Sequence, residues 1–95
     1  MEDNKTGIEL IAQERKEQIE KHGFSIIEDA KFYNDNELLK AAMFCLNPEF
    51  HEWPRGWDII FRKKILQKSA KERAVVAGAF IAAHIDRLNY LENGR

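Results

Sequence analysis

The residues best suited to binding a ligand lie in one short segment of the sequence, from Phe50 to Trp57. This segment carries two indoles, Trp53 and Trp57, with the guanidinium of Arg55 between them and Pro54 restricting the backbone. Aromatic rings stack on nucleobases, and a planar guanidinium forms paired hydrogen bonds with phosphate oxygens. The segment therefore predicts a pocket for a small anion that carries a base. In the alternative interpretation, the tryptophans only fill a small core.

Basic residues are concentrated between Arg55 and Arg73, although the chain of 95 residues has a net charge of only −1. A local basic patch on a nearly neutral protein suits a small anionic ligand better than a long nucleic acid. Polar side chains of the first and last helices could add contacts. The predicted ligand-binding residues are Arg15, Gln18, His22, Phe24, Trp53, Arg55, Trp57, Arg62, Lys63, Arg73, His84 and Arg87, with Tyr33 as a further aromatic candidate.

The charge is divided unevenly along the chain. Residues 1–52 contain 6 basic and 12 acidic side chains, a net charge of −6, whereas residues 53–95 contain 9 and 4, a net charge of +5. Oppositely charged halves could also attract each other, within one chain or between two copies. The basic patch therefore has two interpretations, ligand binding and self-complementarity.

Carboxylates offer a second kind of chemistry. Glu14, Glu17 and Glu20 follow one another at intervals of three residues, which places them on one face of a helix where they could hold Mg²⁺. This spacing resembles the first half of the motif of the all-α nucleotide pyrophosphohydrolases of the MazG type. Their second half is a Glu-x-x-Asp on a later helix, of which only Asp86 is present. The resemblance implies an alternative function as a Mg²⁺-dependent pyrophosphohydrolase; the main hypothesis needs no catalytic residue, metal or cofactor.

Other features bound the class of protein. There is no glycine-rich phosphate loop, which argues against P-loop chemistry. The one cysteine, Cys45, falls among apolar residues at helical spacing and is expected in the core; it cannot form an internal disulfide, which fits a reducing compartment. No apolar stretch approaches the roughly 20 residues that cross a bilayer, and the N-terminus does not resemble a secretory signal. We therefore expect a cytoplasmic protein of a bacterial host cell, with no membrane partner.

Helical periodicity and capping signals predict one all-α domain over residues 1–95, with three helices. The first covers about residues 7–22, between a capping box of Thr6 and Glu9 and a stop at Gly23. The second begins at a cap at residue 34 or 35 and ends before the Asn-Pro pair at 47–48. The third follows a capping box of residues 69 and 72 and runs to about residue 91. Residues 47–68 are irregular, with a short helix or strand possible near 59–66.

The last predicted helix has two apolar faces and several small residues. A helix with apolar side chains on two sides must be central or shared with another subunit. Small residues such as Ala77 and Gly78 let a neighbouring helix approach closely. A chain of this length also buries little surface on its own. These features predict a homo-oligomer.

The sequence resembles a group of small phage and prophage proteins over about residues 9–89. The pattern that carries the resemblance is Glu14-Arg15-x-x-Gln18, His22-Gly23-Phe24, Glu37-Leu38-x-x-Ala41-Ala42, Trp53-Pro54 and Arg73-Ala74-x-x-x-Ala77-Gly78-Ala79-x-Ile81-Ala82-Ala83-x-Ile85-Asp86-Arg87-Leu88. The group is similar in kind, without a shared motif, to phage proteins that sequester nucleotide immune signals. The resemblance implies an oligomer that captures an ADP-ribose derivative or a cyclic dinucleotide without chemistry and so counters host immune signalling. A further alternative is a protein-interaction module or an inhibitor of a host protein.

Overall fold

The structure is a computed structural model, which describes residues 5–22 and 36–93. The described residues form four helices and no strand: α1 (Gly7–His22), α3 (Glu37–Leu46), α4 (Ile59–Leu66) and α5 (Ala70–Asn93). The expected all-α class is confirmed, and the bounds of α1 match the predicted helix. The expected count of three helices is wrong, because residues 59–66, where the sequence left helix and strand open, form α4.

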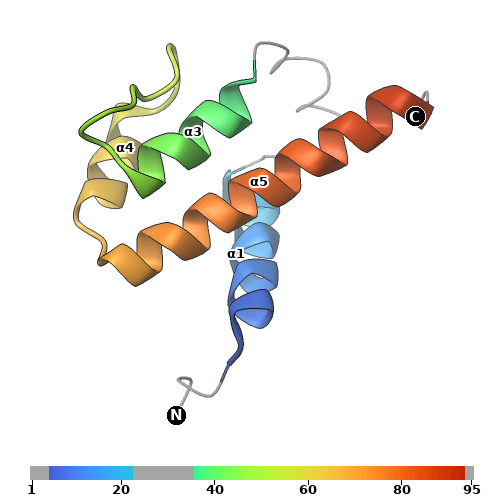
Figure 1. Cartoon of the computed structure of the whole chain (residues 1–95), viewed down its shortest axis with the longest axis horizontal. Coiled ribbons are helices and arrows are strands. Elements are labelled where there is room, and N and C mark those ends of the chain that lie inside the picture. Colours follow the sequence, from blue (N-terminus) through green and yellow to red (C-terminus); the bar gives the residue numbers. More distant parts are fainter. Residues whose placement is uncertain (1–4, 23–35, 94–95) are drawn as a thin grey trace.

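The longest helix, α5, runs through the middle of the molecule. In Figure 1, α3 and α4 lie on one side of α5, and α1 crosses it on the other. Both α3 and α1 pack directly against α5. The buried core lies mainly between α3, α4 and α5 and consists of Leu38, Ala41, Ala42, Phe44, Cys45, Ile65, Val76, Ala77, Phe80 and Ala83. The central helix therefore carries the contacts that position everything else.

The first and last helices begin with the predicted capping boxes. The backbone N–H of Thr6 donates to Glu9 Oε1 at 2.8 Å, and that of Glu9 donates to Thr6 Oγ1 at 3.2 Å. The same reciprocal pair joins Ser69 and Glu72, at 2.9 and 3.1 Å. These bonds satisfy N–H groups that a helix start leaves without partners. They also lower the pKa of both glutamates, mainly through the backbone hydrogen bond that each carboxylate accepts.

The helices α3 and α4 begin in different ways. The N-cap of α3 is Asn36, in the left-handed conformation with φ of 64°, and its side chain makes no capping bond. The predicted caps, Asn34 and Asp35, lie outside the described residues, as does the predicted stop at Gly23. The N-cap of α4 is Asp58, whose Oδ1 accepts a hydrogen bond from the N–H of Ile60 at 2.8 Å. An aspartate cap thus explains why a helix starts directly after the two tryptophans.

The crossing of α1 and α5 depends on Gly78. A Cβ atom at this position would lie 2.5 Å from Cδ1 and 2.8 Å from Cγ1 of Ile11 on α1. No side chain fits at such distances without displacing Ile11. This confirms that the small residues of α5 admit a neighbouring helix closely.

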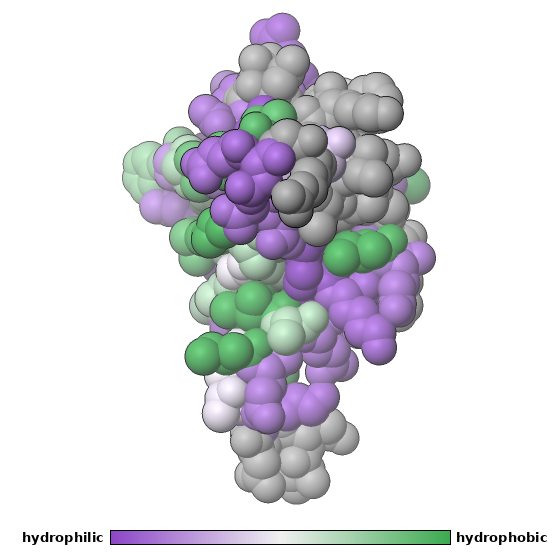
Figure 2. All heavy atoms as spheres, turned by 90° about the vertical axis from the view of Figure 1, so that its right-hand side faces the viewer, coloured by the Kyte–Doolittle hydropathy of each residue, from purple (hydrophilic) through white to green (hydrophobic). Residues whose placement is uncertain are grey.

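Part of the surface of α5 remains apolar. Ile81, Ile85 and Leu88 follow one another at helical spacing and are 38%, 51% and 39% exposed. Seen from the side at which α5 ends, green apolar patches interrupt the hydrophilic surface (Figure 2). None of the described helices combines the length and the apolar character needed to cross a lipid bilayer.

Candidate functional site

The chain between α3 and α4, residues 47–58, forms a strap that carries both tryptophans. Trp53 is fixed within it by a hydrogen bond from its indole Nε1 to the carbonyl oxygen of Asp58, at 3.2 Å. Its ring also meets Phe44 of α3 and Phe61 of α4 edge to face, with centroids 5.4 and 5.8 Å apart. Such aromatic pairs are favourable beyond the area they bury. The strap is therefore held against both helices by one side chain.

Trp57 connects the strap to the central helix. Its ring lies 5.4 Å from that of Trp53, nearly perpendicular at 87°, and 5.7 Å from that of Phe80 on α5. Both indoles are half-buried. The core-filling interpretation is thus correct for part of each ring, while the rest of each ring remains available to solvent.

A hollow of about 750 Å³ lies against this strap, and we call it the strap pocket. Both indoles line it together with Phe44, and Arg55 and Arg62 supply positive charge. A volume of this order is typical of pockets for small molecules. Trp53, Arg55 and Trp57, which the sequence analysis singled out, thus line one hollow.

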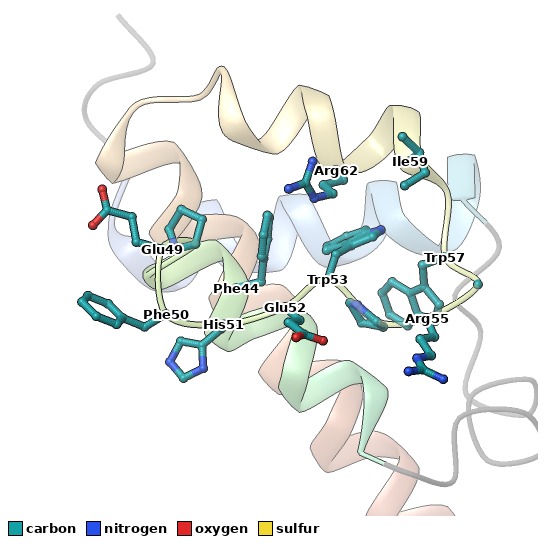
Figure 3. Close-up of a pocket in the computed structure, with 13 residues that line it drawn as sticks. Phe44, Glu49, Phe50, His51, Glu52, Trp53, Arg55, Trp57, Ile59 and Arg62 are labelled. Carbon is teal, nitrogen blue, oxygen red and sulfur yellow. The ribbon is translucent and has the colours of Figure 1, made fainter.

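The two guanidiniums approach the strap pocket from different places. The guanidinium carbon of Arg62 lies 5.5 Å from the centroid of the Phe44 ring, a cation–π contact that holds the side chain in place. Arg55 is exposed on the strap beside Trp57. Figure 3 shows Arg62 near the rings of Phe44 and Trp53, and Arg55 near Trp57 with its charged end directed away from Arg62.

Acidic side chains that the sequence analysis did not select also line the strap pocket. Glu49 and Glu52 balance the two arginines in formal charge, and His51 lies between them on the strap. A second hollow of about 420 Å³ shares Phe50 to Arg55 with the first and extends to α3 at Lys40. The acidic residues flank the tryptophans in the sequence, and that proximity was the signal that could have identified them.

Arg73 lies elsewhere and contacts the backbone. Its Nε donates to the carbonyl oxygen of Cys45 at 3.1 Å, and one terminal nitrogen donates to that of Lys68, also at 3.1 Å. It therefore binds the last turn of α3 and the segment before α5. Lys63 is exposed on α4 and does not line the strap pocket.

Four more predicted site residues lie on α1 and α5, apart from the strap. Arg15, Gln18 and Arg87 are buried and His84 is half-buried, and none of them lines the strap pocket. Of the remaining candidates, Phe24 and Tyr33 lie outside the described residues, as does the side chain of His22 at the end of α1. The structure thus separates these four residues from those at the strap pocket, while Lys63 and Arg73 belong to neither group.

The carboxylates proposed for Mg²⁺ do not assemble. Asp86 lies 3.5 Å from the guanidinium of Arg15. In residues 5–22 and 36–93, no three side chains of the His, Cys, Asp and Glu types are grouped so that they could hold a metal ion. The half motif of Glu14, Glu17 and Glu20 thus has no second half in this part of the chain.

Cys45 is part of the core, as expected. It is 0% exposed, and burial raises the pKa of its thiol to about 12, with a smaller opposing effect of Arg73. At neutral pH this thiol therefore stays protonated and is a poor nucleophile.

Comparison of the chain with family models, with curated proteins and with solved structures gives no significant match in any of the three.

Proposed function

We propose that the protein binds a small nucleotide-derived anion in the strap pocket and releases it unchanged. The observation that carries this proposal is the position of Trp53 and Trp57, half-buried in one hollow of about 750 Å³ that Arg55 and Arg62 also line. Indole rings provide stacking surfaces for a base, and guanidiniums provide paired donors for phosphate oxygens.

The rings are held in place before any ligand arrives. Trp53 has contacts with Phe44, Phe61 and Trp57, and Trp57 has one with Phe80. A side chain that is already ordered loses little conformational entropy when it binds. The strap pocket therefore offers pre-formed aromatic surface, which favours tight capture.

The balance of charge limits the class of ligand. Arg55 and Arg62 line the strap pocket together with Glu49 and Glu52, so the strap pocket has no large excess of positive charge. The carboxylates can accept hydrogen bonds from ribose hydroxyls or base amino groups. This combination suits a ligand with few negative charges, such as an ADP-ribose derivative or a cyclic dinucleotide, better than a polyphosphate. With the resemblance to phage proteins, it extends the proposal to removal of a host immune signal.

Calorimetric titration with ADP-ribose and with cyclic di-AMP tests the proposal. We expect a dissociation constant in the micromolar range or tighter for at least one of them. Arg55→Gln and Trp57→Leu should each weaken binding about tenfold, whereas Lys63→Gln, which removes a charge outside the strap pocket, should change it less than about twofold. Absence of binding to both ligands at millimolar concentration would overturn the proposal.

Analysis of the ligand after incubation with the protein separates capture from hydrolysis. Ligand recovered intact after long incubation with Mg²⁺ supports a binding protein. Release of pyrophosphate from a nucleoside triphosphate, lost in Glu17→Gln, would instead support the MazG-like alternative. Asp86 lies beside Arg15, and it does not form a possible metal site with Glu14, Glu17 and Glu20 in the described residues, which argues against that outcome.

A second proposal, self-association, rests on the exposed apolar stripe of Ile81, Ile85 and Leu88. Oppositely charged halves of the chain would favour contact between two copies. We expect sedimentation equilibrium to show a dimer or larger assembly that Ile85→Glu disrupts and Gln13→Glu, the same new charge on an exposed position of α1, does not. A monomeric wild type that co-purifies with a host protein in an Ile85-dependent way would favour the interaction-module alternative.

A further inference from the structure

The crossing of α1 and α5 contains a group of polar side chains that the proposed function does not use. We call it the helix-crossing cluster, and it consists of Arg15 and Gln18 on α1 with His84, Asp86 and Arg87 on α5. None of the five lines the strap pocket. We infer that this cluster is a separate binding site for one small oxyanion, a phosphoryl or carboxylate group.

The first argument is burial without hydrogen bonds. Gln18 is 0% exposed, and neither its amide nitrogen nor its amide oxygen has a partner within the described chain. Arg87 is 6% exposed, and its Nε also has none. Buried polar groups in folded proteins are nearly always hydrogen-bonded, because leaving them unsatisfied is costly. Two such residues on facing helices indicate that the missing partner lies outside the described residues, and we assign it to a bound group.

The second argument is the arrangement of these residues along the two helices. Ile11 of α1 lies against Gly78 of α5, and Arg15, farther along α1, lies near Asp86, farther along α5. Both helices therefore run in the same direction through the crossing. Gln18, one turn beyond Arg15, therefore lies towards the same end of the crossing as Arg87. The buried amide of Gln18 on α1 and the buried guanidinium of Arg87 on α5 therefore lie towards the same end of the crossing.

The third argument is charge. Two arginines face one aspartate in the cluster, which leaves one positive charge in excess. The guanidinium of Arg15 lies 3.5 Å from the carboxylate of Asp86, longer than the 2.7–2.9 Å of a charge-assisted hydrogen bond. The side chain of Asp86 is 40% exposed, so an oxyanion with two or more acceptor oxygens can compete with it for the donors of the cluster.

The side chains of the cluster differ in their exposure to solvent. The side chain of Asp86 is 40% exposed, that of Arg15 is 10% exposed, and Gln18 is fully buried. Polar groups thus extend from the surface inward. An anion could enter beside Asp86 and meet N–H donors farther inside, while a long polyanion would be excluded because little of the cluster is exposed.

Side-chain amide resonances in nitrogen–proton NMR spectra provide a direct test on the full chain. We expect the Gln18 side-chain amide to shift saturably with inorganic phosphate or with acetate, and not with chloride at equal ionic strength. A response to phosphate alone assigns the site to phosphoryl groups, a response to acetate alone assigns it to carboxylates, and a response to both assigns it to either kind of oxyanion. Equal, non-saturating responses to all three salts would overturn the inference.

Variants make the test specific. Gln18→Leu keeps the approximate size of the side chain and removes the unsatisfied amide, so it should abolish the salt-specific rise in melting temperature while leaving the anion-free protein at least as stable. Asp86→Asn removes the competing carboxylate and should tighten binding about threefold or more. Gln13→Leu, on an exposed position of the same helix, is the matched control and should leave the response to phosphate unchanged.

The inference fails if Gln18→Leu lowers the melting temperature of the anion-free protein, because the amide would then have a partner in the folded chain. It does not depend on the proposed nucleotide site. Trp57→Leu should weaken capture of the nucleotide about tenfold and leave the phosphate response intact, so the failure of one proposal can be distinguished from the failure of the other. Loss of both responses in Trp57→Leu would show a single site and overturn the separation made here.

Discussion

Arg73 stabilises the fold through the same guanidinium geometry that makes arginine a good phosphate ligand. It donates to the carbonyl oxygens of Cys45 and Lys68, which belong to two segments that meet near the start of α5. Planar, forked donors suit two backbone acceptors as well as two phosphate oxygens. The role of an arginine is therefore decided by which acceptors lie within hydrogen-bonding distance of its guanidinium, and sequence spacing does not reveal those acceptors.

Replacing Arg73 should therefore affect stability and leave ligand capture unchanged. We expect Arg73→Met to lower the free energy of unfolding by about 2 kcal/mol, because two bonds to a charged donor are lost and two carbonyls lose their partner. Urea denaturation measures this change. Lys71→Met, which removes an exposed charge from the same helix, should remain within about 0.5 kcal/mol of wild type. An unchanged stability combined with weakened nucleotide binding would contradict the structural role.

At the scale of the helix, the two capping boxes make stability depend on acid. Their hydrogen bonds lower the pKa of Glu9 and Glu72 below the usual 4.5, so these carboxylates stay ionised in the folded chain at a pH where they bind protons in the unfolded chain. The two capping boxes therefore contribute fully to the stability of the folded chain above the usual pKa of 4.5, and this contribution is lost as the pH falls through the lowered pKa of the two glutamates.

We therefore expect Glu9→Gln and Glu72→Gln to weaken the acid dependence of the melting temperature between about pH 5 and pH 3. Glutamine keeps the capping geometry but does not titrate. Thermal unfolding at several pH values measures the slope. Glu92→Gln removes one exposed carboxylate outside both boxes and is the control. The same loss of slope in Glu92→Gln would show that overall charge, and not capping, is responsible.

The contact between α1 and α5 gives a second prediction at this scale. Gly78→Val places atoms where Ile11 already lies and should cost about 2 kcal/mol more than Ala74→Val, the same type of side chain on an exposed position of α5. Chemical denaturation of the two variants gives the difference. Adding Ile11→Ala should recover part of the loss in Gly78→Val, because it frees the space. Equal effects at positions 74 and 78 would contradict the close approach.

How much of this arrangement was predictable depends on whether local rules decide it. The capping boxes and the helical spacing of apolar residues predicted α1 and α5 closely, because both signals act within one or two turns. The tryptophans and the arginine that line the strap pocket are neighbours in the sequence, so a local pattern could single them out. The acidic wall of the pocket was missed although Glu49 and Glu52 lie close to the tryptophans in the sequence. The cation–π contact of Arg62 with Phe44 depends on how α4 packs beside α3, which local spacing does not specify. The separation of Arg15 and Arg87 from the strap depends on how α1 crosses α5, which helical periodicity does not specify.

At the scale of the whole molecule, the strap and the helices share one core. Trp53 and Trp57 contact rings from α3, α4 and α5, so the segment that carries the ligand-binding residues is tied to the packed interior. A loop attached in this way is not expected to open independently.

Tryptophan emission and helical circular dichroism should therefore report the same unfolding transition. We expect coincident urea midpoints and a slope of about 1 kcal/mol per molar urea, near the lower end for small domains. Emission comes only from the strap, whereas dichroism comes from all helices. A change in emission at clearly lower urea than the change in dichroism would show that the strap detaches first and that its pocket is not pre-formed.

The contact of Gly78 with Ile11 also constrains how this sequence can change over generations. A lineage that first acquires a bulkier residue at position 78 passes through a destabilised protein, whereas a lineage that first acquires a smaller residue at position 11 avoids this clash. Descendants of this chain should accordingly show the two sites drifting as a pair and in one order.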